Sequence, residues 1–189
     1  MEPFYQGQLD VFCAIYAVAN ALHITQSMSL SQAKRMLAET LCEQARDPEQ
    51  FAALVYNETD YYRLVDHLLE RYGTALFPVR VARPFAHGAA ASPAEVWDTL
   101  AGWLQGGERR SAVLRFRRYL PFRGVPIVQH WTTPETVQGD TILYRDSSHE
   151  PYAVRSLERF AFVTCAETRT SEQTILVEPA SIRLLEPAG

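Results

Sequence analysis

The stretch GQLDVFCAIYAVANAL, residues 7–22, changes from a polar turn to an almost unbroken run of small and apolar residues. Its large apolar side chains recur at the three- and four-residue spacing of an α-helix, at Val11, Ile15, Val18 and Leu22. Alanines between them let a neighbouring element approach closely, and Asp10 is a residue type that caps helices. The stretch predicts a buried central helix that starts from Asp10 and carries Cys13 near its first turn.

The rest of the first half also has helical patterns. One helix is expected to start at Ser29 or Ser31, and another at the segment DPEQ, where Pro48 suits a first helical turn. The segment NETDYYRLVDHLLERYG is amphipathic, and Gly73 is expected to end its helix.

The pattern changes after Gly73. ALFPVRVARPF alternates like a strand, and SPAEVWDTLAGWLQGG is a short helix that Ser92 caps. Several runs rich in β-branched and aromatic residues follow, separated by Gly, Asp, Pro and Ser: SAVLRFRRYL, VPIVQHWTTPE, DTILYRDSS and FAFVT. The segment QGD, residues 138–140, predicts a hairpin turn.

Helices followed by antiparallel-looking strands favour an α+β fold over a doubly wound parallel sheet. With 189 residues, the chain has the length of one domain, residues 1–189. We expect a helical lobe over about residues 1–75 and a β-sheet lobe over about residues 76–189.

Charge and hydropathy exclude several classes of protein. The chain has 18 basic and 22 acidic residues, a net charge of −4, so no global field favours binding to nucleic acid or anionic lipid. No apolar run reaches the roughly 20 residues of a membrane span, and MEPFYQGQLD does not resemble a secretory signal. We expect a cytoplasmic protein, or one exported without a cleaved signal peptide.

The three cysteines are Cys13, Cys42 and Cys165, and this odd number without a CxxC pair predicts neither a disulfide framework nor a zinc site. No HExxH, Walker, GxGxxG or GxSxG motif is present, so no metal or other cofactor is expected. A buried structural role is the ordinary interpretation for Cys42 and Cys165.

Cys13 is the candidate nucleophile, because the positive end of a helix stabilises a thiolate. A nucleophilic cysteine needs a base that is near it only in the fold. Among five histidines, His130 in PIVQHWTT is the best candidate, since a strand would hold its ring in place. The other candidates are His23, His67, His87 and His149.

The base in turn needs an orienting partner. Asp146 is expected to reach His130 across the QGD hairpin, whereas Asp140 belongs to the turn itself. A developing oxyanion needs hydrogen-bond donors, which the backbone N–H of Cys13 and the side chain of Gln8 or Gln6 could supply.

A glutamine, a cysteine that opens a small-residue helix (CAIYAVANAL), and a later His and Asp together resemble the papain-like cysteine peptidases. These include the peptidase domains of bacteriocin-processing transporters. The resemblance implies a helical lobe packed on an antiparallel sheet lobe, with the active site between them. It also implies a catalytic triad of Cys13, His130 and Asp146, with Gln8 as oxyanion donor.

The chain is therefore expected to be a thiol protease or isopeptidase that acts on a peptide or protein substrate. The resemblance also implies a delivered bacterial effector as one context, with a regulatory or immunity partner protein. Glutamine deamidation, transglutamination and cell-wall amide cleavage use the same acyl-thioester chemistry and stay open. A catalytically silent module that binds a peptide is the alternative from another class. In ERRSAVLRFRRYLPFR, Arg115 and Arg117 are expected on a solvated strand face. The alternative is that these arginines bind an anionic partner or an acidic substrate segment.

Overall fold

A computed structural model of the chain describes residues 3–5, 11–85, 90–148 and 153–189. Within them, the helices are α1 (Cys13–Gln26), α2 (Leu30–Gln44), α3 (Pro48–Val55), α4 (Tyr61–Ala75) and α5 (Pro93–Gln105). The strands are β1 (Val79–Ala82), β2 (Ser111–Tyr119), β3 (Pro126–Thr132), β4 (Pro134–Gln138), β5 (Thr141–Tyr144), β6 (Ser156–Glu158), β7 (Phe162–Val163), β8 (Ile175–Val177) and β9 (Arg183–Pro187). Short 3₁₀ turns lie at Ala166–Thr168 and Pro179–Ser181. The protein is thus a mixed α+β fold.

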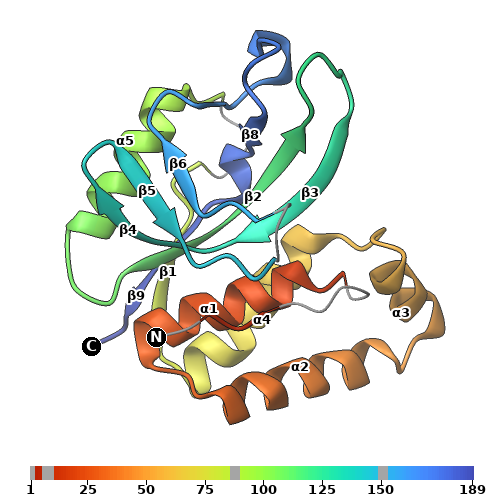
Figure 1. The fold of residues 1–189 in the computed structure, drawn as a ribbon. Coiled ribbons are helices and arrows are strands. Elements are labelled where there is room, and N and C mark those ends of the chain that lie inside the picture. Colours follow the sequence, from red (N-terminus) through yellow and green to blue (C-terminus); the bar gives the residue numbers. More distant parts are fainter. Residues whose placement is uncertain (1–2, 6–10, 86–89, 149–152) are drawn as a thin grey trace.

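Helix α1 is the central element of the helical part of the fold. Ile15, Val18 and Leu22 are each at most 1% exposed, and the helix contacts α2 and α4 as well as β2, β3 and β9. Figure 1 shows α1 and α4 between α2 and the sheet. A helix that is apolar on nearly all sides is buried on nearly all sides.

The start of α1 differs from the prediction. Phe12, and not Asp10, is the N-cap residue, and among the described residues no side chain caps this helix end. The first backbone carbonyl of the helix is that of Phe12, which accepts hydrogen bonds from the N–H groups of Ile15 and Tyr16. Cys13 is therefore the first residue of the helix, closer to its positive end than expected.

Three other predicted helix starts are confirmed. Ser29 and Ser92 each form a capping box, with Gln32 and Glu95 respectively. Asp47 caps α3 through the N–H groups of Glu49 and Gln50.

Gly73 does not end its helix, contrary to the prediction, because α4 continues to Ala75. A Cβ atom at position 73 would lie 2.9 Å from Cγ2 of Val79 in β1. The missing side chain therefore allows β1 to pack closely on α4.

The strands form two sheets. In the larger sheet the order is β1-β9-β2-β8-β7, with β3 paired to β2, and the smaller sheet has the order β4-β5-β6. All described pairs are antiparallel except β7 with β8, so the expected antiparallel sheet has one parallel pair. Helix α5 packs on the sheet side, in a second apolar cluster that includes Trp97, Phe116 and Ile142.

The predicted strand over VPIVQHWTTPE is divided at Thr133 into β3 and β4. The hydroxyl of Thr133 donates to the backbone carbonyl of Ala17 in α1 over 2.8 Å. Helix α1 thus holds the junction between the two sheets. The QGD turn is confirmed: β4 and β5 form a hairpin around Gly139, which has φ of 58°.

Candidate active site

The sulfur of Cys13 lies at the start of α1, facing the sheet part of the fold. The residue is buried, with 6% of its surface exposed, while the N–H groups of the first helical turn have no partner within the helix. Strand β3 packs against α1 and brings His130 to this helix end. Cys13 and His130 line one cavity, and interaction with Cys13 contributes to the raised pKa of His130.

Asp146 lies on the other side of the imidazole. Its Oδ1 atom is 3.1 Å from Nε2 of His130, and the two side chains are 0% and 7% exposed respectively. Because Nε2 faces Asp146, the remaining ring nitrogen, Nδ1, is the one available to Cys13. The ring of Phe116 contacts the imidazole edge to face at 5.5 Å, which limits how far the imidazole can turn.

The β4–β5 hairpin explains how residues sixteen positions apart meet. The backbone N–H of Arg145 donates to the carbonyl of Thr133 over 2.8 Å, one step beyond the paired strands. Asp146 then follows directly, beside the end of β3. The prediction that this hairpin places Asp146 next to His130 agrees with these contacts, although β4 and not β3 is the strand that pairs with β5.

Asp146 is held by more than the imidazole. Its Oδ2 atom accepts from the hydroxyl of Thr132 at 2.7 Å, and its Oδ1 atom accepts from the N–H of Ser148 at 2.7 Å. Burial opposes ionisation of this carboxyl, but His130, Thr132 and Ser148 together hold its pKa below its usual range. The carboxylate is therefore charged at neutral pH.

The imidazole responds to these neighbours. Burial alone lowers the pKa of His130, whereas its hydrogen bonds to Asp146 and Cys13 and the negative charges there raise the pKa to about 10. These interactions outweigh the effect of burial, and the His130–Asp146 bond is a direct contact. Burial, with a smaller effect of the neighbouring Cys13, raises the pKa of Tyr61, so this tyrosine stays neutral beside the sulfur.

A small cavity opens onto the sulfur and the imidazole. It has a volume of about 170 Å³. Its lining residues are Val11, Cys13, Asn57, Val128, Gln129, His130 and Ser148. A larger apolar groove of about 620 Å³ lies between residues 3–5, α1 and α2, but none of the three triad candidates lines it. The smaller cavity is the one where the sulfur can meet a carbonyl group.

The other predicted residues fall elsewhere. Gln8 and Gln6 lie outside the described residues, as do His87 and His149. His23 is buried at the far end of α1, with Nδ1 2.5 Å from the carbonyl oxygen of Met28, and His67 lies 3.5 Å from Glu43 on the surface. Neither of these two histidines lines the cavity at Cys13.

Sequence reasoning missed Asn57 and Gln129, which line the cavity. Asn57 follows α3 with a positive φ of 61°, a conformation that asparagine adopts more readily than most residues. Gln129 precedes His130, and its Oε1 accepts a hydrogen bond from Arg115. The Asn after a predicted helix was a usable turn signal, but nothing in the sequence placed it near Cys13.

In the described part of the chain, no cluster of three or more His, Cys, Asp or Glu side chains could hold a metal ion. No helix in the same residues has the length and apolar character needed to cross a membrane. When the chain is compared with models of known protein families no model matches, and a comparison with curated proteins also finds no match.

Proposed function

We propose that this protein is a cysteine hydrolase that acts on a peptide or isopeptide bond, with Cys13 as nucleophile. The observation that carries the proposal is the contact of one buried imidazole with both the Cys13 sulfur and the Asp146 carboxylate. A buried ionised pair is costly to maintain without a compensating role. Clusters of perturbed titratable groups beside a cavity are typical of active sites.

The first half of the proposed reaction acylates the enzyme. The thiolate of Cys13 attacks the substrate carbonyl carbon, a C–S bond forms and the carbonyl oxygen becomes an oxyanion. The backbone N–H groups at the start of α1 stabilise this charge, together with the side chain of Gln8 or Gln6. The His130 imidazolium gives its proton to the leaving amine as the C–N bond breaks.

The second half releases the product. Neutral His130 takes a proton from a water molecule, the oxygen attacks the thioester, and the C–S bond breaks to give a carboxylic acid and the Cys13 thiolate. Asp146 keeps the imidazole oriented and stabilises its charged form throughout. This sequence of steps needs no metal ion or cofactor.

The order of Cys13, His130 and Asp146 and their contacts support membership of the papain-like peptidases as part of this proposal. Helices α1–α4 would then form the helical lobe, and the sheets with α5 the second lobe. Glutamine deamidation and transglutamination would use the same three side chains, as would cell-wall amide cleavage, so the identity of the released group distinguishes these activities.

An electrophilic peptide tests the proposal. A peptidyl acyloxymethyl ketone should add to Cys13 of the intact protein, detected by mass spectrometry, and should add nothing to Cys13→Ala. Exposed Cys42 provides an internal control for ordinary thiol reactivity. Modification of Cys13 no faster than that of Cys42 would contradict the hydrolase and favour a silent binding module.

With unfolded casein as substrate, new amino termini indicate a peptidase, whereas ammonia release indicates a deamidase. The Cys13→Ala protein should produce neither.

A further inference from the structure

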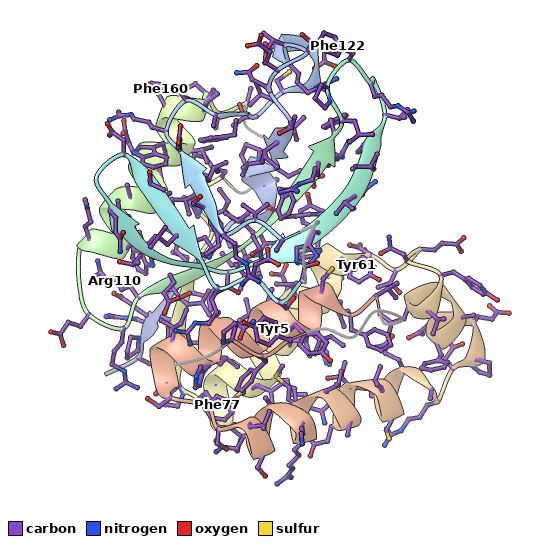
Figure 2. The ribbon with its side chains drawn as sticks, viewed as in Figure 1. Tyr5, Tyr61, Phe77, Arg110, Phe122 and Phe160 are labelled. Carbon is purple, nitrogen blue, oxygen red and sulfur yellow. The ribbon has the colours of Figure 1, made fainter. Side chains whose placement is uncertain are left out.

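The hairpin of β2 and β3 carries apolar side chains that the fold does not bury. Phe122 is 86% exposed, Val125 67%, Leu120 41% and Ile127 40%. Figure 2 shows Phe122 at the tip of this hairpin, far from Tyr61. Tyr61 belongs to α4 and lies near Cys13. A run of exposed apolar residues on a projecting hairpin is typical of an interaction site.

Among the residues that the structure describes, one edge of strand β3 has no partner strand, and it is called the free edge below. In the described residues β3 pairs only with β2. The N–H of Arg115 donates to Ser181 and its carbonyl accepts from Glu178, so the backbone of Arg115 faces away from β3. In an antiparallel ladder, the residue opposite such a position also turns its backbone groups outward.

Trp131 is opposite Arg115, and Gln129 is opposite Arg117. Arg117 is two residues after Arg115 in β2, so its backbone faces the same way as that of Arg115. The N–H and carbonyl of Gln129 therefore point away from the sheet. Trp131 is buried beneath the helices, whereas Gln129 is exposed and lines the cavity at Cys13. The free edge of β3 thus leads directly to the candidate nucleophile.

A hydrogen bond from a neighbouring strand holds the side chain of Gln129 on this edge. Arg115 donates to Oε1 of Gln129 and also forms an ion pair with Glu178 at 3.3 Å. These contacts of Arg115 restrain the Gln129 side chain. Ile127 and Gln129 are both exposed, and the pairing of β3 with β2 shifts register between Val128 and Pro126. Across the cavity, Asn57 follows Tyr56, which is 74% exposed.

We propose that the free edge of β3 and the apolar face of its hairpin bind an extended, apolar segment of the substrate protein as an added strand. The identification of the partner as a substrate rests on the proposed function. The backbone groups of Gln129 would pair with the segment, and exposed Ile127 and Val125 would contact its apolar side chains. From Gln129 to Pro126 the strand extends for about 10 Å, enough to pair with roughly four residues of extended chain.

The positive charge of the β2–β3 hairpin favours a partner with acidic residues. Residues 111–132 contain Arg115, Arg117, Arg118 and Arg123 but no acidic residue. Glu178 bonds to Arg115 and Arg117 and so balances only part of this charge. Two copies paired through β3 would bring two such hairpins together and repel each other, whereas a segment flanked by acidic residues would be attracted.

A binding experiment in the Cys13→Ala protein tests the surface without requiring catalysis. The ligand is a fluorescein-labelled peptide of alternating valine and threonine, six residues long, with glutamate at each end. We expect saturable binding by fluorescence anisotropy and slower hydrogen exchange of the Gln129 amide. Methylation of alternate backbone nitrogens in the peptide should weaken binding by about tenfold or more, since it removes ladder hydrogen bonds.

Ile127→Asp should also weaken binding by about tenfold, because the site loses an apolar contact and gains a negative charge. Ile127→Thr keeps a β-branched residue and should give a smaller loss, which guards against a misfolded hairpin. Val81→Asp is the matched control, since Val81 is 37% exposed on β1, another edge strand. It should bind like the parent.

Several outcomes would overturn the docking surface. The surface is contradicted if the parent does not bind the peptide, or if Ile127→Asp binds it as well as the parent does. It is also contradicted if the Gln129 amide is not protected, or if light scattering shows a dimer that Ile127→Asp abolishes. If the peptide binds as expected and Cys13 of the unsubstituted protein shows ordinary reactivity, the surface stands and the hydrolase fails. If Cys13 is reactive and the peptide does not bind, the hydrolase stands and the surface fails.

Discussion

His130 and Asp146 form a buried hydrogen-bonded pair, with Nε2 3.1 Å from Oδ1, at the point where α1 presents the sulfur of Cys13. The pair joins β3 of the larger sheet to the segment that follows β5 of the smaller sheet, and it fixes which ring nitrogen faces the sulfur. Both the proposed chemistry and part of the folding stability therefore depend on one contact.

Replacing the carboxylate tests this contact. Asp146→Asn should lower the pKa of His130 and destabilise the fold by about 3 kcal/mol, because a buried imidazolium then lacks its counter-charge. Urea unfolding measures the stability, and an NMR titration measures the pKa. Asp140→Asn is the matched control in the hairpin turn and should change stability by less than about 0.5 kcal/mol. A larger loss at Asp140 than at Asp146 would contradict the pairing.

The raised pKa of His130 also predicts how stability depends on pH. The folded protein holds this proton up to a pKa of about 10, whereas an unfolded histidine releases it near pH 6.5. The stabilising contribution is complete below about pH 6.5 and is lost as the pH rises towards 10.

Unfolding curves at several pH values check this dependence. The decline between about pH 6.5 and 10 should be absent from His130→Gln, and the difference between the two proteins removes the contributions of other groups. A parallel decline in both proteins would contradict the assignment. At the acid end, the lowered pKa of Asp146 predicts that stability falls as the pH drops below about 4.

Two helical glycines provide a contrasting pair. Gly73→Ala would place Cβ 2.9 Å from Cγ2 of Val79, and we expect a loss of about 1–3 kcal/mol from this overlap. At Gly102 in α5 no described atom lies within 4 Å of the new Cβ, so Gly102→Ala should stabilise the protein by about 0.5–1 kcal/mol. Thermal unfolding measures both. Equal effects at the two positions would contradict the close packing of β1 on α4.

Periodicity predicted the α+β class, because the apolar spacing changes from a helical to a strand pattern after α4. The helix caps were predictable for the same local reason: Ser29, Asp47 and Ser92 bond to N–H groups two or three residues away. The QGD hairpin was also local, since its turn depends on Gly139 alone adopting a positive φ in the turn.

Features that depend on distant contacts were not predictable. Thr133 divides the expected strand because its hydroxyl bonds to Ala17, 116 residues earlier in the chain. Gly73 was read as a helix end, but its role depends on the approach of Val79. Asn57 reaches the cavity only because the α3–α4 connection lies beside the start of α1 in the fold.

The central claim is that His130 activates Cys13, and the rate of iodoacetamide alkylation at Cys13 near pH 6 measures it most directly. A Cys42→Ser, Cys165→Ser protein leaves one thiol to follow, and adding His130→Gln removes the imidazole while keeping a polar side chain. We predict that alkylation at this pH is at least about tenfold faster with His130 than without it, since the imidazolium stabilises the thiolate. Equal rates in the two folded proteins would contradict the account.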